Sequence, residues 1–306
     1  MTFKTLRLIL KAARPNQWIK NLVIYTSLIF SGQLFTGDLF LKTTYGFLVF
    51  CLLSSVSYIL NDIVDFPYDK KHSRKKFRPI ASGQLSIQDA SFFVFTASFV
   101  GLLLALMFST PFFVISFAFL LLHFFYSLYF KQRAILDIFA ISFSFMLRAF
   151  AGQVITGYHI QIWLVLSIFF ISLFLATVKR HAELVTNGTE ARKSLSFYND
   201  HFLFFLTSTF ATLTIITYSM YTFLESPSLN ASTIFQQFSM FVPSIEARKW
   251  FMITIPIVVY GIARYAQLLY DREGGEMPEK VITRDKHLIA TIVIWGIIVI
   301  SLLYIF

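Results

Sequence analysis

Long stretches without a charged residue recur along the chain and are separated by shorter polar segments. A helix needs about 20 apolar residues to cross the hydrocarbon core of a bilayer. On that criterion we predict nine spans, of which the first is shorter and more polar than the others. They lie at about Asn21–Phe35, Thr43–Leu60, Ala90–Phe130 (divided in two at Ser109-Thr110-Pro111), Ile138–Gly157, Ile162–Val178, Phe202–Leu224, Trp250–Tyr270 and Leu288–Phe306.

The same pattern indicates the fold class. Unpaired backbone amides are costly in lipid, and an α-helix satisfies them within one segment. We therefore predict an all-α integral membrane protein, a bundle of about nine transmembrane helices that forms a single domain over residues 1–306. Residues 1–20 alternate basic and apolar side chains and lack the apolar core of a cleavable signal peptide. They are expected to form an interfacial amphipathic helix.

Composition supports an integral membrane protein. Apolar residues make up 57% of the chain and charged residues 14%, with a mean hydropathy of +0.69. A soluble domain carries about 25% charged residues, so the bilayer is an expected partner and nucleic acid is not. The single cysteine, Cys51, lies in an apolar run, and no disulfide framework is expected. The sequence leaves open whether the chain forms a homo-oligomer.

The 26 Lys and Arg residues, which give a net charge of +10, are distributed unevenly. With nine spans, 22 of them fall on one side of the membrane, and the loops of the other side hold Lys42, Arg248 and Lys249. Loops rich in Lys and Arg face the cytoplasm. We therefore predict a cytosolic N-terminus, and cytosolic active-site loops at residues 61–89 and 179–201.

Oxygen-bearing side chains cluster at the end of the second predicted span, at Asn61, Asp62, Asp65 and Asp69. Residues four apart on a helix are offset by roughly 40°, so Asn61, Asp65 and Asp69 would line one stripe. Hard oxygen ligands suit Mg²⁺, which is usually shared with substrate phosphates. The alternative is a solvated helix end. Because Pro67 disfavours helical geometry at the preceding residue, Asp69 could approach the metal from a loop.

A strongly basic segment, Lys70 to Arg78, follows the acids. A positive-inside loop would explain its charge, but cations directly after metal-binding acids favour a diphosphate site. Lys75 and Arg78 are the candidates for contacts to diphosphate. Six further residues near cytosolic ends of spans are candidate phosphate ligands: Lys20, Tyr126, Lys131, Lys179, Arg180 and Arg264. For Lys20 and Lys131, membrane anchoring is the alternative.

Two charged residues belong to the fifth predicted span. Asp137, at its start, could accept hydrogen bonds from substrate hydroxyl groups or orient a basic neighbour, and the alternative is an acid favoured by the helix dipole. Arg148 lies about 16 Å deeper along the helix. A charge so deep in a span normally faces the bundle interior and is a functional candidate, although structural pairing is the alternative.

These motifs together resemble the UbiA superfamily of membrane prenyltransferases, whose first aspartate-rich motif is similar to Asn61-Asp-x-x-Asp-x-x-x-Asp69. More narrowly, the chain resembles the polyprenyl-phosphate phosphoribosyltransferases over nearly its whole length. Lys70 and Ser73 depart mildly from the pattern of that branch. The similar segments are Arg14–Asn21, Asp69–Gly83, Leu136–Ala140, Arg148–Gly152, Lys179–Leu184, and Arg264-Tyr265 followed by Gly275-Glu276 and Arg284-Asp285.

The resemblance implies a Mg²⁺-dependent reaction at a bacterial cytoplasmic membrane. Phosphoribosyl diphosphate (PRPP) would give its 5-phosphoribosyl group to a polyprenyl phosphate, with release of diphosphate. Asn61, Asp62, Asp65 and Asp69 would hold the metal, and the three aspartates together with Asp137 would be catalytic. The incoming phosphate oxygen is already anionic, so no strong general base is required. None of the six histidines lies in a metal-ligand spacing.

Two alternatives are kept. Aromatic prenyltransferases of the same superfamily transfer a prenyl group from a prenyl diphosphate to an acceptor such as 4-hydroxybenzoate. They carry a second aspartate-rich motif near the sixth span, where this chain has Lys179-Arg180-His181-Ala182-Glu183. Cations at that point favour direct contact between protein and phosphate. A lipid transporter is the non-enzymatic alternative, which the odd number of predicted spans and the lack of a detectable internal repeat disfavour.

Overall fold

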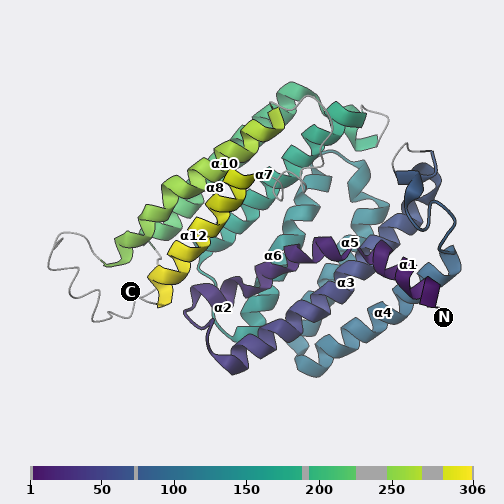
Figure 1. Cartoon of the computed structure of the whole chain (residues 1–306), viewed down its shortest axis with the longest axis horizontal. Coiled ribbons are helices and arrows are strands. Elements are labelled where there is room, and N and C mark those ends of the chain that lie inside the picture. Colours follow the sequence, from purple (N-terminus) through teal and green to yellow (C-terminus); the bar gives the residue numbers. More distant parts are fainter. Residues whose placement is uncertain (1–2, 72–74, 188–192, 225–246, 271–284, 305–306) are drawn as a thin grey trace. The chain divides into compact units, whose positions relative to one another are not determined.

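The structure is a computed structural model that describes residues 3–71, 75–187, 193–224, 247–270 and 285–304. Every regular element within these ranges is helical (Figure 1), which confirms the predicted all-α class. The chain divides into two compact units. Unit 1 comprises Met1–Leu28 and Leu34–Tyr158, and unit 2 comprises Ile29–Gln33 and His159–Phe306.

Unit 1 is held together by an apolar cluster between three of its long helices. Phe50 and Leu53 of α3, Phe112 and Phe119 of α5, and Ile155 of α6 are all buried in this cluster. The elements of unit 1 are α1 (Phe3–Ala13), η1 (a 3₁₀-helix, Pro15–Tyr25), α3 (Gly37–Asp69), η2 (Lys75–Phe77), α4 (Ile87–Phe108), α5 (Thr110–Leu128), η3 (Phe130–Gln132) and α6 (Leu136–Thr156).

The predicted division of the long apolar stretch at residues 90–130 is confirmed. Ser109 separates α4 from α5 and adopts an extended conformation. Its side-chain oxygen accepts a hydrogen bond of 3.3 Å from the amide of Phe112, which is the usual role of a serine before a helix. Pro111 lies in the first turn of α5, where the missing amide hydrogen would have no intrahelical partner.

The N-terminal helix α1 is shorter than the predicted 20 residues and packs within unit 1. Ile9 and Ala12 of α1 are buried against Ile59, Ile80 and Leu85. The helix ends at Ala13. Three apolar side chains of α1 remain exposed, and they are available for the predicted contact with lipid: Phe3, Leu6 and Leu10.

Eight helices in the described ranges are long and apolar enough to cross a membrane, one fewer than predicted. The predicted first span at Asn21–Phe35 is not a single long helix, because η1 continues to Tyr25 and α2 covers only Thr26–Phe30.

Unit 2 contains long helices joined by hydrogen bonds between hydroxyl side chains. Ser167 of α7 donates a hydrogen bond of 3.2 Å to Thr217 of α8, and the Tyr218 hydroxyl lies 2.7 Å from that of Thr254. Its elements are α7 (Ile162–Asn187), η5 (Lys193–Phe197), α8 (Asp200–Leu224), η6 (Ala247–Thr254), α10 (Ile255–Tyr270) and α12 (Lys286–Tyr304). The predicted loop at 179–201 thus begins as a helix, because α7 continues to Asn187.

Candidate active site

The acidic residues lie on the last three turns of α3, which continues through Pro67 to Asp69. The expectation that Asp69 approaches from a loop is therefore wrong. Proline in a helix removes the backbone hydrogen bond of its own nitrogen. The bond that Pro67 cannot make is the one to the carbonyl of Ile63, and the helix continues to Asp69 without it. The amide of Lys70 still donates to the carbonyl of Phe66, at 3.2 Å.

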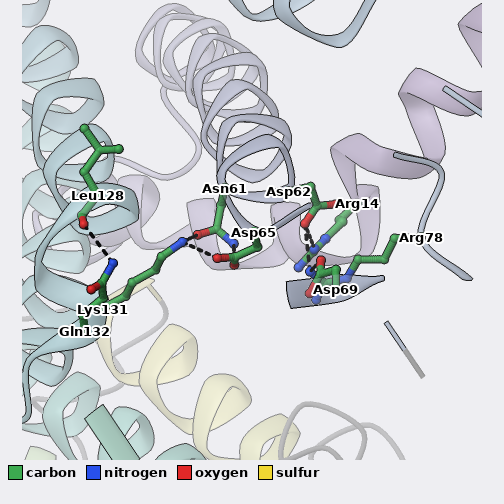
Figure 2. Close-up of polar contacts among 9 residues, drawn as sticks. All are labelled: Arg14, Asn61, Asp62, Asp65, Asp69, Arg78, Leu128, Lys131 and Gln132. Carbon is green, nitrogen blue, oxygen red and sulfur yellow. Dashed lines mark hydrogen bonds and ion pairs between the residues drawn. The ribbon is translucent and has the colours of Figure 1, made fainter. Parts of the chain in front are cut away.

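One cation holds the first pair of these polar side chains. Lys131, which is 5% exposed, donates from Nζ to Asp65 Oδ1 at 2.5 Å and to Asn61 Oδ1 at 3.1 Å. Asn61 Nδ2 in turn donates to Asp65 Oδ2 at 2.9 Å (Figure 2). The ammonium of Lys131 is thus buried and held by two side-chain oxygens. Membrane anchoring, the alternative for Lys131, does not describe this arrangement.

Two guanidinium groups hold the other two carboxylates. Arg78 Nη1 donates to Asp62 Oδ1 at 3.0 Å and to Asp69 Oδ2 at 2.6 Å. Arg14 Nη2 donates to the same oxygen of Asp62 at 2.5 Å (Figure 2). Asp69 therefore groups with Asp62 and not with Asp65. Residues seven apart on a helix are offset by only about 20°, compared with about 40° for residues four apart.

Arg78 is positioned by a compact turn whose apolar residues pack against α1 and α3. The amide of Ser82 donates to the carbonyl of Arg78 at 2.8 Å. Ile80 and Leu85 are 1% and 2% exposed and pack on α1 and α3. Gly83 has a φ of +74°, in the left-handed region that glycine adopts without a steric penalty. The segment that follows the acids is thus folded against them.

Arg14 joins the candidate site through Asp62, a role that the sequence did not predict. It has a φ of +52°, which is uncommon for a residue with a side chain, and it immediately precedes η1 and Pro15. Its guanidinium also lies 5.3 Å from the ring centre of Tyr58, one turn before Asp62. The Arg-Pro pair at the end of an amphipathic helix was the available signal, but its meaning depends on packing between α1 and α3.

The remaining predicted residues of unit 1 have other surroundings. Asp137 is fully buried in the first turn of α6, where its Oδ1 accepts a hydrogen bond of 2.9 Å from the amide of Ile138. The helix dipole favours an acid at this point. Arg148 is 3% exposed and donates from Nε to Asn21 Oδ1 at 2.7 Å. Three further candidates are half-buried: Lys20, Lys75 and Tyr126.

The predicted phosphate ligands of unit 2 have acidic neighbours. Arg180 is fully buried and forms an ion pair with Glu183, while Arg264 Nη2 lies 2.8 Å from Asp285 Oδ2. Hydrogen bonds from Arg264 keep the pKa of Asp285 below its ordinary value. Lys179 is half-buried on α7. Three residues of the motifs predicted here lie outside the described residues: Gly275, Glu276 and Arg284.

The donor set of unit 1 fits Mg²⁺ when phosphate completes the coordination. In the described part of the chain, no three His, Cys, Asp or Glu side chains form a group that could hold a metal on their own. Mg²⁺ usually keeps waters and binds one or two carboxylates together with substrate phosphates. Asp62 and Asp69, which share one guanidinium nitrogen, supply such a pair of carboxylates. Asp65 and Asn61 supply further oxygens of the same chemistry.

Comparison with known protein families shows the class to which this helical membrane protein belongs. Residues 22–289 match the model of the UbiA prenyltransferase family, and the chain belongs to this family. It is an integral membrane transferase of the UbiA superfamily, as its sequence motifs indicated.

Named relatives cover nearly the whole chain. The chain is 30% identical over 294 residues to decaprenyl-phosphate phosphoribosyltransferase of Mycolicibacterium smegmatis. The aligned region covers 94% of this chain and 89% of that relative. It is 29% identical over 305 residues to the protein of the same name from Corynebacterium glutamicum, and this alignment covers 97% of the present chain and 86% of the relative.

Solved structures share the fold at low sequence identity. A UbiA homolog from Archaeoglobus fulgidus bound to GPP and Mg²⁺ superposes with a TM-score of 0.67 and 17% identity, over 97% of this chain and 96% of that chain. Its complex with DMAPP and Mg²⁺ gives a TM-score of 0.69 and 16% identity, over 96% and 99%. The likeness establishes the fold of the present chain.

Proposed function

We propose that this protein transfers the 5-phosphoribosyl group of PRPP to a polyprenyl phosphate and releases diphosphate, with Mg²⁺ as cofactor. The observation that carries the proposal is the similarity, at about 30% identity over more than nine-tenths of the chain, to decaprenyl-phosphate phosphoribosyltransferases. The cations among the carboxylates of unit 1 support it independently, because such a mixture suits a metal-bound diphosphate.

The bonds of the reaction require no group that the site lacks. A phosphate oxygen of the lipid forms a bond to C1 of the ribose, and the bond from C1 to the diphosphate oxygen breaks. The electron pair leaves with diphosphate, and positive charge develops on the sugar ring in between. The attacking oxygen is already ionised, so no side chain needs to remove a proton. Positioning and charge stabilisation are then the main contributions of the protein.

The side chains that pair in the structure are the ones that would receive the leaving group. Mg²⁺, when bound, would neutralise part of the charge that accumulates on diphosphate. Asn61, Asp62, Asp65 and Asp69 are its proposed ligands. Arg14, Arg78 and Lys131 would move from these carboxylates to phosphate oxygens, with Lys75 beside them. The cations would thus exchange an ion pair with a carboxylate for one with a phosphate. Because each buried cation keeps a partner of opposite charge, the free-energy cost of burying it is lowered.

A phosphoribosyl donor is favoured over a prenyl donor by unit 2. At the place of the second aspartate-rich motif, α7 carries Lys179 and the buried Arg180 with its partner Glu183. We assign Lys179, Arg180 and Arg264 to a second phosphate group and Asp137 to the ribose hydroxyls. The excess of Lys and Arg on one side supports a site that faces the cytosol of a bacterial cytoplasmic membrane.

A transfer assay tests the proposed function. Purified protein in detergent with Mg²⁺ is offered labelled PRPP with polyprenyl phosphate and, separately, labelled prenyl diphosphate with 4-hydroxybenzoate. Label should enter the lipid in the first reaction and no aromatic product should form in the second. Polyprenol, which has no anionic oxygen, is the matched control acceptor and should remain unlabelled. Product in the aromatic reaction alone would replace this function by prenyl transfer.

Arg78→Gln tests the exchange of ion pairs. Because Arg78 bridges Asp62 and Asp69, its removal should tighten the binding of Mn²⁺ alone about tenfold. The same change should weaken the binding of diphosphate in the presence of Mn²⁺. Free Mn²⁺ is measured by electron paramagnetic resonance during titration. Lys76→Gln, which removes an exposed cation from the same segment, is the control and should change neither affinity.

A further inference from the structure

Arg148 of α6 is held rigidly within unit 1 by neutral groups. Its Nε donates to Asn21 Oδ1 at 2.7 Å, and its Nη1 donates to the backbone oxygen of Ser144 at 2.8 Å and to the side-chain oxygen at 3.0 Å. The guanidinium also lies 4.7 Å and 5.3 Å from the ring centres of Phe119 and Phe145. The side chain is therefore fixed in one position.

The charge of Arg148 is not balanced by these contacts. Among the described residues, no Asp or Glu forms an ion pair with it, and its Nη2 makes no hydrogen bond. Neutral acceptors satisfy hydrogen-bond donors but leave a full charge in surroundings of low dielectric constant. Ionisable residues inside membrane spans usually pair with an opposite charge or mark a path for a charged ligand. An anion is the partner that the site lacks.

His123 of α5 adds a second unexplained group at the same place. Its ring is 4.5 Å from that of Phe119, which also contacts Arg148. Its Nε2 is buried and has no hydrogen-bond partner in the part of the chain that the structure describes. Lys20 directly precedes Asn21 on η1, and the Asn21 side chain accepts the hydrogen bond from Arg148, so Lys20 belongs to the same part of unit 1. The charges of Lys20 and Arg148 both act on the imidazole. We call Lys20, His123 and Arg148 the basic cluster.

The basic cluster adjoins the carboxylates of the candidate active site through Tyr58. This residue lies one turn before Asp62 on α3, and its ring faces the guanidinium of Arg14, which binds Asp62. Ser54, one turn before Tyr58 on α3, donates a hydrogen bond of 3.1 Å to the same oxygen of Asn21 that accepts from Arg148. A ligand that reaches from the aspartates past Tyr58 would therefore meet the basic cluster. A molecule with two separate phosphate groups, or two molecules side by side, could occupy both places.

We infer that Lys20, His123 and Arg148 bind a phosphate monoester beside the site of the metal-bound diphosphate. A phosphate monoester accepts several hydrogen bonds and carries the charge that Arg148 lacks. A neutral imidazole can present a hydrogen on Nε2. The inference rests on the proposed function for its two sources of this chemistry: the 5-phosphate of PRPP and the phosphate of the polyprenyl lipid.

Binding measurements without turnover test this site. Ribose 5-phosphate and a short polyprenyl phosphate are titrated separately into the purified protein in detergent by isothermal calorimetry. His123→Asn should weaken the binding of one of them about tenfold, and Arg148→Gln by about 10- to 100-fold. The ligand that is affected identifies the source of the phosphate. Polyprenol of the same chain length should bind to all variants equally.

Arg133→Gln is the control, because it removes an exposed cation just before α6 and should change neither affinity. If Arg148→Gln does not fold, His123→Asn decides, and thermal unfolding monitors its integrity. Wild-type affinity for both phosphates in folded His123→Asn would overturn the inference. The readout requires no transfer, so a protein that fails the transfer assay can still bind a phosphate monoester here, and the two failures are distinguishable.

Discussion

Asp65→Asn is expected to reduce transfer of the labelled phosphoribosyl group at least about 100-fold while leaving the protein folded. The substitution keeps the shape of the side chain and its ability to accept a hydrogen bond from Asn61. It removes the charge that pairs with Lys131 at 2.5 Å and that would contribute to metal binding. Asp65 is a more specific test than Asp62, because Asp62 binds two guanidinium groups and a substitution there would disturb more contacts.

Initial rates at saturating PRPP and polyprenyl phosphate measure this effect. Asp38→Asn is the matched control, since Asp38 stands at the other end of the same helix, is 71% exposed and pairs with Lys42. It should retain the wild-type rate. Near-normal turnover in Asp65→Asn would remove the assignment of the aspartates to the metal, although it would leave the membership of the family untouched.

The apolar pattern predicted most helices because lipid leaves few alternatives to a helix. The division at Ser109 was visible, since a capping serine followed by proline is a local signal. The residue at which α7 ends could not be predicted from hydropathy. Lys179–Glu183 resembles a polar loop by hydropathy, but it continues as a helix in which Arg180 reaches Glu183 three residues on. Likewise the predicted first span is divided between the 3₁₀-helix η1 and the short α2, which hydropathy does not distinguish from one long α-helix.

The acidic cluster was predictable from spacing on one helix, whereas its division was not. The cation that each carboxylate binds depends on the positions of Lys131 and Arg78, and neither of these residues belongs to α3. Arg14 and His123 were missed for the same reason. The role of Arg14 depends on how α1 packs, and the spacing of His123 from other histidines gives no sign of a metal site. Its neighbour Arg148 is 25 residues away in sequence, and only the tertiary structure brings the two together.

The close approach of η1 to α6 explains how Arg148 and Asn21 meet, and it depends on Gly152. A Cβ atom added at Gly152 would lie 2.0 Å from the backbone oxygen of Ile24 and 2.9 Å from its carbonyl carbon. Backbone atoms of a fully buried residue cannot rotate away, so η1 would have to move. Because Asn21 is one turn away on η1, the same shift would disturb its hydrogen bond to Arg148.

Gly152→Ala should therefore destabilise the protein by about 3 kcal/mol and lower the Tm in detergent by about 10 °C. Two glycines in other helices provide controls. At Gly101 a Cβ would meet side-chain atoms and no backbone atom among its three nearest neighbours, with Leu53 at 2.6 Å and Leu52 at 3.6 Å, so Gly101→Ala should cost less. At Gly296 it would meet nothing within 4 Å, and Gly296→Ala should be neutral or slightly stabilising. Equal Tm values for Gly152→Ala and Gly296→Ala would show that η1 does not pack on α6 at this distance.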